Sequence, residues 1–468
     1  MTPAPQPTPT ADPTPAAGPT PTPEPSPTAE PTPAPTPSAS ATPAAPVVSV
    51  TAWGADGGDG ADDTAAVAAA VAATAGTGAT LEFPAGTYLV TKLVLPAGVR
   101  VAGAGEQATW LKGALEVNSD SAFRDLTLGV AGRALRFVNG ARDVLFERVT
   151  FVGGGGMASG EDQGVIRFSG QRHAHSITFR DCTVGANSAD GNGVSIVSYA
   201  WEGGTYDHIL FERVHFLSSP RMTVEVIQRS DGVHPASDGY DHIDFVDCVF
   251  EPAGSEALSF DTSNGSAGFS TVQGCLFKGS GANPAYPWGQ TVEFNRVVGM
   301  TFVGNTLARA RGAMLNWSGR PGVDCQTVVS GNTFDTTLVY AAVTPDNLTQ
   351  VIYMNGVQGA VVRDNLVRTD AGAGPMYVSG VCGSTFAGNR WLDLRPTTTS
   401  PVAYVTDASC DNLFAGELFS SAYRYGTLVF KNGADRNTVR GCTFVNGGTR
   451  PVSVEAGLTV TLADNVVQ

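Results

Sequence analysis

Three acidic residues in the middle of the chain have the side chains and the surroundings that acid–base chemistry needs. Glu225, Asp261 and Glu293 each lie in a short run in which apolar and polar residues alternate. Such alternation is typical of a β-strand whose apolar side chains face inward while the residues between them face solvent. Hydrolysis needs a pair of carboxyl groups that flank the bond to be cleaved. We therefore predict these three residues as catalytic, with the roles of acid and base left open.

A short unit that recurs along the chain must position these strands. Versions of the hexapeptide 245–250, Phe-Val-Asp-Cys-Val-Phe, return at intervals of 23 to 34 residues from residue 121 almost to the C-terminus. Such intervals suit a solenoid, in which no unit buries its apolar face alone and stacked neighbours share one core. Aligned on the residue that follows an Asp, Arg or Gly turn, the markers of the thirteen rungs are Leu126, Val149, Cys182, Val214, Cys248, Cys275, Asn305, Asn332, Asn365, Asn389, Glu417, Cys442 and Asn465.

Stacked rungs place the predicted catalytic residues in columns along the solenoid. Glu225 and Glu293 are two rungs apart, or about 9.6 Å at a strand spacing of about 4.8 Å. That gap suits the wider carboxyl separation of an inverting hydrolase, and Asp261 between them would raise the pKa of the acid. The other interpretation is an ordinary solvated strand surface. In rung order the outward column reads Arg167, Ser195, Glu225, Ser259, Glu293, Asn316 and Tyr353, with Asp261 and Asn295 in the next outward column.

Residues 47–90 differ from the rungs. They contain Gly-Ala-Asp-Gly at 54–57, Asp-Asp-Thr-Ala-Ala-Val at 62–67 and Phe-Pro-Ala-Gly-Thr-Tyr at 83–88. The middle piece predicts a short helix over about 63–74, because an acidic residue can accept the first amide hydrogen bonds and an alanine run follows. Such a helix would cover the open end of the solenoid.

Together these pieces resemble the N-terminal signature of the pectate-lyase-like, right-handed parallel β-helix superfamily, of the rhamnogalacturonase, epimerase and tailspike type. We therefore predict an all-β fold: a right-handed, single-stranded parallel β-helix of about 13 rungs over 47–468, with an N-terminal cap over 47–90. The superfamily includes polygalacturonases, lyases, uronan epimerases and phage depolymerases, so the resemblance implies work on carbohydrate without choosing a reaction. The polygalacturonase motifs Asn-Thr-Asp, Gly-His-Gly and Arg-x-Lys are absent, so no catalytic residue is carried over.

A second set of residues is predicted to bind the substrate around the carboxylates. All six histidines fall within 70 consecutive residues, and long inserted loops at 198–206 and 228–240 interrupt the rungs there. Loops on a rigid scaffold commonly carry function. The predicted substrate-binding residues are Arg167, Tyr199, Trp201, Arg229, His234, Tyr240, Trp288, Arg296 and Asn316.

The seven cysteines predict one disulfide and no zinc site. No Cys-x-x-Cys pair occurs, and four cysteines stand at rung markers, where small side chains stack. Cys382 and Cys410 each lie seven residues before consecutive markers, so their Cα atoms should be about 5 Å apart. We predict that they form a disulfide in an exported protein.

Residues 1–46 hold 17 of the chain's 30 prolines, interleaved with Thr, Ala and Ser. This composition predicts a disordered Pro/Thr-rich linker of the kind found between modules of secreted proteins. Because the chain opens on this linker without an apolar signal segment, we interpret it as a soluble, secreted piece. The alternative is a cytoplasmically made protein with a disordered arm, such as a virion component. The net charge of −15 argues against a nucleic-acid partner or an anionic membrane surface.

These residues are compatible with three functions. We slightly favour a secreted hydrolase, monomeric or trimeric, that cleaves the glycosidic bonds of a polysaccharide containing uronic acid. A polysaccharide lyase or epimerase would instead need a base beside a cation, with Arg167, Arg229, His234 and Arg296 nearby, or beside a bound calcium ion. The third is a non-catalytic glycan-binding adhesin or a tailspike-type depolymerase. No metal ligand is predicted and no cofactor is certain.

Overall fold

The structure is a computed structural model in which the chain divides into two units, Met1–Ala44 and Ala45–Gln468. It describes residues 45–130, 135–153, 164–169, 173–185, 191–199, 204–229, 239–262, 268–286, 289–340, 350–372, 374–396, 398, 400–423, 426–446 and 450–468. The linker predicted over 1–46 lies, except for its last two residues, outside this described part.

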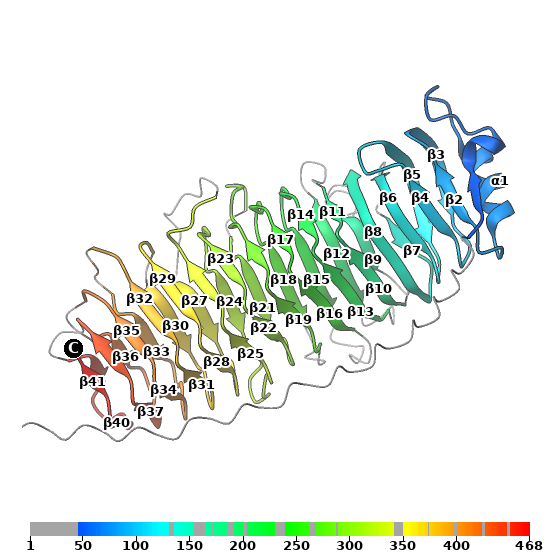
Figure 1. The fold of residues 1–468 in the computed structure, drawn as a ribbon. Helices are drawn as coiled ribbons and strands as arrows, with labels where there is room; N and C mark the ends of the chain where they lie inside the picture. The colour runs from blue at the N-terminus through cyan, green and yellow to red at the C-terminus, as the bar shows by residue number, and fades with distance from the viewer. Residues whose placement is uncertain are drawn as a thin grey trace, which may run out of the picture. The chain divides into compact units, whose positions relative to one another are not determined.

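The second unit consists of parallel strands stacked in coils along one axis (Figure 1). A typical coil contributes three short strands, as in β13 (Tyr206–Glu212), β14 (His215–Phe216) and β15 (Val224–Arg229). Each strand pairs in parallel with its equivalent in the next coil, so that β13 pairs with β16 (Tyr240–Val246). The predicted single-stranded, right-handed parallel β-helix is confirmed.

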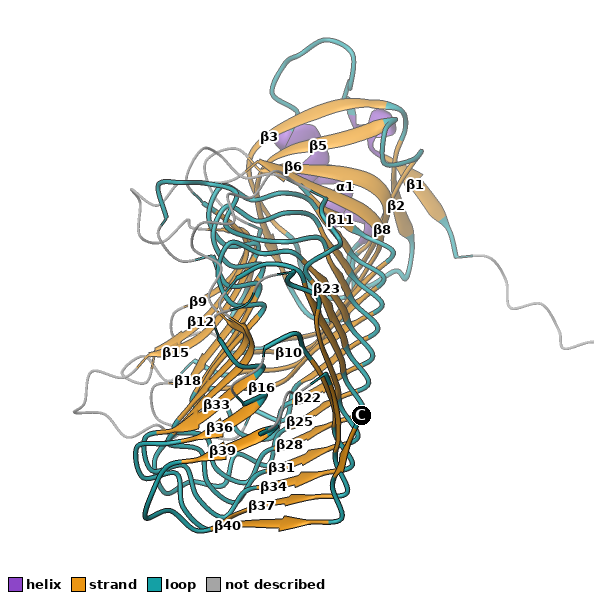
Figure 2. Ribbon diagram, turned by 90° about the vertical axis from the view of Figure 1, so that its left-hand side faces the viewer, coloured by secondary structure: helices purple, strands orange, loops and turns teal. Residues whose placement is uncertain are grey.

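Two sheets run along the stack, of which sheet A starts at the N-terminal end and sheet B begins only at residue 164 (Figure 2). Sheet B has 11 strands: β9 (Gly164–Ser169), β12 (Asn192–Tyr199), β15, β18 (Leu258–Thr262), β21 (Val292–Asn295), β24 (Leu315–Ser318), β27 (Gln350–Asn355), β30 (Gly374–Ser379), β33 (Ala403–Thr406), β36 (Leu428–Phe430) and β39 (Val452–Val454). Sheet A holds the other 30 described strands, with two strands from each later coil. These two sets of strands count as one sheet because longer strands near the N-terminus pair with both of them.

The strands of sheet A fall into three sets. The N-terminal set is β1 (Val47–Ser49), β2 (Thr80–Phe83), β3 (Gly86–Val94), β4 (Arg100–Gly103), β5 (Thr109–Val117), β6 (Ala122–Val130), β7 (Arg136–Phe137) and β8 (Ala141–Gly153). The first strands of the later coils are β10 (Ala174–Arg180), β13, β16, β19 (Thr271–Gln273), β22 (Thr301–Val303), β25 (Val328–Ser330), β28 (Val361–Arg363), β31 (Thr385–Ala387), β34 (Leu413–Ala415), β37 (Asn437–Arg440) and β40 (Val460–Ala463). The second strands are β11 (Thr183–Val184), β14, β17 (Val249–Phe250), β20 (Leu276–Phe277), β23 (Thr306–Ala308), β26 (Thr333–Asp335), β29 (Leu366–Thr369), β32 (Arg390–Asp393), β35 (Leu418–Ser420), β38 (Thr443–Val445) and β41 (Val466–Val467).

The turn before each marker explains the repeat. In all thirteen rungs the residue before the marker has a left-handed backbone, with φ between 52° and 66°. Glycine adopts this conformation without a steric penalty, and Asp tolerates it better than most residues. Those residues are Asp125, Arg148, Asp181, Arg213, Asp247, Gly274, Gly304, Gly331, Asp364, Gly388, Gly416, Gly441 and Asp464.

The stack extends beyond the predicted rungs at its N-terminal end. β6, which carries the first marker, pairs with β5, and β5 pairs with β3. The region predicted as a cap therefore already contributes strands. The described helix α1 (Thr64–Thr74) agrees with the predicted helix and buries Val67 and Val71. Asp62 accepts a hydrogen bond from the Thr64 amide at 2.9 Å, as expected of a residue at a helix start.

Inside the coils, equivalent residues stack on each other. The rings of Phe179, Phe211 and Phe245 follow one another with centroid distances of 4.8 and 4.9 Å. From Asn305 to Asn389 the markers form a buried ladder, in which each side-chain carbonyl accepts the backbone N–H and the side-chain amide of the preceding rung. Glu417 ends this ladder by accepting from Asn389 and from the Trp391 indole N–H.

The predicted disulfide is present. Cys382 and Cys410 form a disulfide with a Cα separation of 4.5 Å. The other five cysteines are buried thiols, including Cys248 and Cys275. Burial of the Cys182 side chain raises the pKa of its thiol to about 12, so this thiol is not a nucleophile at neutral pH.

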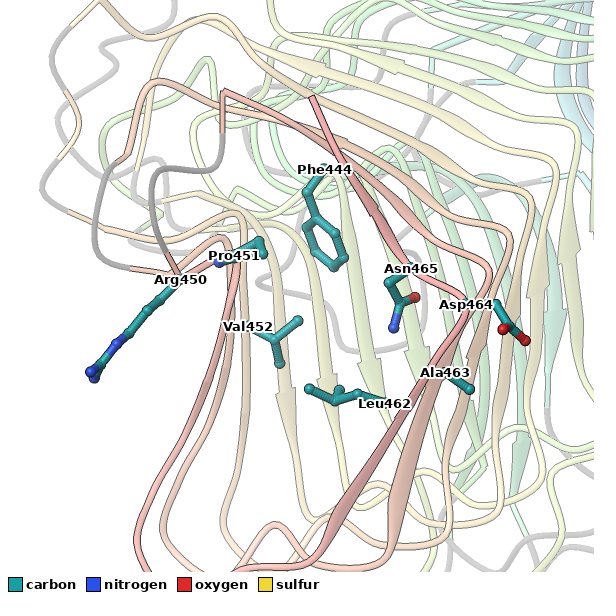
Figure 3. A pocket seen from close by; sticks show the side chains of 8 residues that line it. All are labelled: Phe444, Arg450, Pro451, Val452, Leu462, Ala463, Asp464 and Asn465. Atoms are coloured by element: carbon teal, nitrogen blue, oxygen red, sulfur yellow. The ribbon is translucent and has the colours of Figure 1, made fainter.

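The last coil leaves the core open at the C-terminal end. A cavity of about 440 Å³ lies there, and Phe444, Val452 and Leu462 line it together with Asn465 (Figure 3). Leu462 and Val467 are about half exposed. These residues stand at the positions that a following coil would cover elsewhere in the stack.

Candidate functional site

The outer face of sheet B carries the predicted column in register. Pairing of the strands places the residues of successive coils opposite each other in the order Arg167, Ser195, Glu225, Ser259, Glu293, Asn316 and Tyr353. Asp261 pairs with Asn295 in the neighbouring outward column. The apolar residues between them are buried, as with Val224 and Val226 around Glu225. The alternation of the sequence therefore sets these columns.

The prediction that this column faces solvent is wrong for its first part. Arg167, Ser195, Glu225 and Ser259 are buried, and the Glu225 residue is only 1% exposed. Glu293, Asn316, Asp261 and Asn295 are half-buried. Polar side chains pack against Glu225, as described next.

Glu225 is held by two residues of that kind. Asn192, at the start of β12, donates a hydrogen bond from its side-chain amide to the Glu225 carboxylate at 2.8 Å. The Arg221 guanidinium lies 3.7 Å from the other carboxylate oxygen and also donates to the Asn192 carbonyl at 3.4 Å. A buried carboxylate needs such partners, because an unpaired buried charge lowers the stability of the fold by about 3–5 kcal/mol. Neither partner was predicted from the sequence.

Glu293 combines partial exposure with a shifted pKa. The Ser259 hydroxyl donates to one of its carboxylate oxygens at 3.0 Å, and the Asn316 amide donates to the other at 3.4 Å. Burial raises the pKa of the Glu293 carboxyl, and the negative charges of Glu256 and Glu225 raise this pKa further, against the two hydrogen bonds.

Glu256 is the third carboxyl group of this cluster. It stands two residues before β18, is 3% exposed and accepts a hydrogen bond from the Ser255 hydroxyl. Burial raises the pKa of Glu256, and the charge of Glu225 adds to that shift while Arg221 opposes it. Sequence reasoning missed Glu256 because it lies outside the alternating part of the strand. Its position in a run of small residues, Ala-Gly-Ser-Glu-Ala, was the available signal.

Asp261 lies in β18 of sheet B and Arg296 directly follows β21 of the same sheet, whereas Tyr240 is the first residue of β16 in sheet A. Tyr240 is buried and packs against Phe260 with a ring distance of 5.9 Å, so it does not present its ring on the surface. Burial raises the pKa of the Tyr240 hydroxyl well above its usual value, and the nearby Asp261 charge adds to this. Arg296 is exposed directly after β21, and its carbonyl accepts the Thr262 hydroxyl.

The remaining predicted binding residues cannot be placed in this cluster. Trp201, His234 and Trp288 lie outside the described residues, as do the side chains of Tyr199 and Arg229.

The described histidines lie on sheet A or at its edge and not on sheet B. His175, His208, His215 and His242 belong to β10, β13, β14 and β16. The rings of His208 and His242 stack at 4.6 Å, and His215 contacts Glu251 at 2.8 Å. The clustering of histidines along the sequence therefore does not mark the carboxylate cluster.

The described residues show neither a metal-binding cluster nor a membrane-spanning helix. Within them, no group of three or more His, Cys, Asp or Glu side chains is arranged to hold a metal ion. The described part of the chain also contains no helix of the length and apolarity needed to cross a membrane.

Comparisons with known proteins agree with this fold. Residues 47–139 match the model of the family described as rhamnogalacturonase A/epimerase, pectate lyase-like. The predicted resemblance to the pectate-lyase-like superfamily is thereby confirmed. A search of curated proteins found no match to the chain.

Among solved structures, tailspike protein 3 of bacteriophage CBA120 is similar over 90% of this chain and 61% of its own, with 13% identity and a TM-score of 0.53. The A-module of the mannuronan C-5 epimerase AlgE4 of Azotobacter vinelandii aligns over 90% of this chain and 97% of its own, with 15% identity and a TM-score of 0.36. The Agl-KA catalytic domain aligns over 91% and 70%, with 15% identity and a TM-score of 0.40. At 13% identity the likeness to tailspike protein 3 concerns the fold alone.

Proposed function

We propose that this protein is a secreted carbohydrate-active enzyme that hydrolyses the glycosidic bonds of a uronic-acid-containing polysaccharide on the outer face of sheet B. The observation that carries the proposal is Glu293, a half-exposed carboxyl group whose pKa is raised by burial and by two neighbouring carboxylates. A general acid must keep its proton near the working pH, and a raised carboxyl pKa serves this need. The matched family model, named for a rhamnogalacturonase and an epimerase, supports a polysaccharide as the substrate class.

Asp261 is the best-placed partner for Glu293. Ser259, in the coil before Glu293, is the direct neighbour of Glu293. Asp261 lies on the same strand as Ser259, two residues further along. A strand spacing of about 4.8 Å and a rise of about 3.3 Å per residue put the Cα atoms of Asp261 and Glu293 about 8 Å apart. Inverting hydrolases hold their two carboxyl groups about 6.5–9.5 Å apart, with room for a water molecule. We assign Glu293 as the acid and Asp261 as the base.

Glu225 takes a different role from the one its sequence position suggested. Its burial keeps it from contacting a sugar, whereas its negative charge helps to raise the pKa of Glu293. Glu256 acts in the same way. Both are therefore positioning residues, which act on the substrate only through Glu293.

A lyase or an epimerase is the second candidate. The exposed guanidinium of Arg296 follows directly after Asn295, the register partner of Asp261. A cation in this place could neutralise a uronate carboxylate, so that Asp261 would abstract a proton from the sugar instead of activating water. A glycan-binding adhesin would use the same face without turnover, whereas a tailspike-type depolymerase would cleave its glycan there.

A substrate panel separates these candidates. The full chain is incubated with uronic-acid and neutral polysaccharides, and the products are followed by mass and by ultraviolet absorbance. We expect saturated fragments from a uronan, and a loss of about 10²- to 10⁴-fold in rate for Glu293→Gln and for Asp261→Asn. Glu251→Gln changes a carboxylate that directly follows strand β17 of sheet A, and this matched control should keep the rate. Unsaturated fragments would replace the hydrolase with a lyase, and an absence of fragments would favour the epimerase or the adhesin.

A further inference from the structure

The outward column that contains Glu293 continues into three tyrosines. Asn316 pairs with Tyr353, Tyr353 pairs with Tyr377, and Tyr377 pairs with Tyr404, each on the next strand of sheet B from β24 to β33. All three tyrosines are half-buried, and the residues on either side of each in the strand are buried. Their side chains therefore stand on the outer face of the same sheet, downstream of the candidate site.

The three rings are ordered by contact with one another. Tyr353 and Tyr377 stack with a centroid distance of 5.5 Å and an interplanar angle of 9°, and Tyr404 meets Tyr377 at 6.1 Å and 61°. Because each ring covers part of its neighbour, the column offers ring edges and hydroxyl groups to a ligand more than open ring faces. Burial raises the pKa of the Tyr377 and Tyr404 hydroxyls, so both remain neutral groups that can donate and accept hydrogen bonds.

Polar side chains accompany this column in the next outward position. Asn295, Ser318, Asn355, Ser379 and Thr406 follow one another in register. Asn355 is exposed and Asn295 and Ser318 are half-buried, whereas Ser379 and Thr406 are buried, and Ser379 donates to Asp407 at 2.9 Å. Aromatic edges and hydroxyls beside the accessible side chains of Asn295, Ser318 and Asn355 form a surface suited to a chain of sugar rings, which has both apolar C–H groups and many hydroxyl groups.

A lysine marks the far end of the column. The Lys431 ammonium lies 4.1 Å from the centre of the Tyr404 ring, and no described residue forms an ion pair with it. Among the described residues a second lysine sits over a tyrosine in this way: Lys278 lies 5.7 Å from the Tyr340 ring, but it pairs with Glu251 at 2.6 Å. An ammonium group without a carboxylate partner favours an acidic sugar at this end.

We infer that Tyr353, Tyr377, Tyr404 and Lys431 form a binding surface that holds the polysaccharide along the solenoid axis, downstream of Glu293, and that selects for acidic sugars. The inference rests on the proposed function and deepens it. Two coil steps separate Tyr353 from Tyr404, or about 9.6 Å, and two more separate Tyr353 from Glu293. Only a chain long enough to cover those coils can use the surface, whereas a short fragment at Glu293 cannot.

Calorimetric binding to the full chain carrying Glu293→Gln tests this surface without cleavage of the probe. The probes are alginate and polygalacturonate oligomers of graded length, with dextran oligomers as the neutral comparison. In this background we expect Tyr377→Ala to weaken the binding of long uronate oligomers about tenfold and Lys431→Met to weaken it several-fold, with short oligomers unaffected. Tyr377→Phe keeps the ring and should show a smaller loss, which separates the hydroxyl from the packing. Tyr340→Ala and Lys278→Met are the matched controls and should bind as the parent does.

The inference is overturned if Tyr377→Ala and Lys431→Met bind long uronate oligomers as the parent does, if dextran binds as well as the uronates, or if neither uronate binds. The outcomes distinguish the surface from the reaction. If the wild type cleaves no substrate but Tyr377→Ala and Lys431→Met weaken binding, the binding surface is supported and the hydrolase is contradicted. If the wild type cleaves the substrate but both variants bind as the parent does, the hydrolase is supported and the binding surface is contradicted.

Discussion

The Ser259 hydroxyl lies one coil before Glu293 and donates a hydrogen bond of 3.0 Å to its carboxylate. This bond favours the ionised form of Glu293, whereas burial and the charge of Glu256 favour the protonated form. The protonation state of Glu293 therefore results from opposing influences that single substitutions can remove separately.

Two substitutions should move the pH profile of the reaction in opposite directions. A general acid loses activity as the pH rises through its pKa, so the alkaline limb of kcat/KM reports the pKa of Glu293. Ser259→Ala removes a bond to the ionised form and should shift this limb to higher pH. Glu256→Gln removes a repelling charge and should shift it to lower pH. Shifts of the same sign, or none, measured on the substrate found in the panel would contradict the assignment of Glu293.

Glu417 should make the stability of the fold depend on pH. Burial raises the pKa of this carboxyl from 4.5 to about 7, against hydrogen bonds from Trp391 and Asn389. Because the folded pKa lies above the unfolded one, the stabilisation is complete below pH 4.5 and is lost as the pH rises to about 7. The loss is on the order of 3 kcal/mol.

Urea unfolding at pH 4.5, 6 and 8 measures this dependence. The Glu417→Gln side chain cannot ionise. The wild type should therefore lose stability relative to this variant between pH 4.5 and about 7, and the difference should change little above that pH. A constant difference between the two proteins would contradict the raised pKa. Glu256 and Glu293 also have raised pKa values, and they are present in both proteins.

An asparagine inside the ladder should contribute more to stability than Asn465, the asparagine marker of the last rung. In Asn365, the side-chain carbonyl accepts two hydrogen bonds from Asn332, and its amide donates to Val329 and Asn389. Asn365→Ala leaves several buried groups unpaired and should lower the free energy of unfolding by about 2–4 kcal/mol. Asn465, at the open end, donates to Val439 and accepts from Cys442, and it is half-buried. Asn465→Ala should therefore cost less, and equal losses in urea unfolding would contradict a cooperative ladder.

The Cys382–Cys410 disulfide should be present in the protein from an oxidising compartment. Alkylation after denaturation should label five thiols without reduction and all seven cysteines after it. The bridge closes a segment of 28 residues, so its removal by Cys382→Ser together with Cys410→Ser should cost about 2–4 kcal/mol. Labelling of seven thiols without reduction would contradict both the bridge and the proposed secretion.

The sequence predicted those features that follow from local repetition. The turn residues, such as Asp247 and Gly274, need a left-handed backbone, so their recurrence fixed the rungs and hence the column from Arg167 to Tyr353. Equal offsets from the markers likewise placed Cys382 beside Cys410. The N-terminal strands β3 and β5 were not counted as rungs, because no marker of the repeat stands in them.

The features that depend on packing between coils could not be predicted. Glu225 is contacted by Asn192 and Arg221, of which Asn192 lies 33 residues away in another coil. Glu256 enters the cluster from outside the alternating pattern. The histidines were grouped with the carboxylates because they are near in sequence, whereas each coil passes through sheet A before it reaches sheet B. His208 and Glu225 illustrate this, since β13 and β15 belong to different sheets of one coil.

Cleavage of the substrate in ¹⁸O-labelled water tests the central claim most directly. If Asp261 activates a water molecule and Glu293 protonates the leaving oxygen, every new reducing end should carry one ¹⁸O atom, and NMR of the first products should show inversion at the anomeric carbon. Glu293→Gln and Asp261→Asn should remove this incorporation, while Glu251→Gln keeps it. Fragments without ¹⁸O that absorb in the ultraviolet, or labelled fragments that form at the wild-type rate in both Glu293→Gln and Asp261→Asn, would contradict the account.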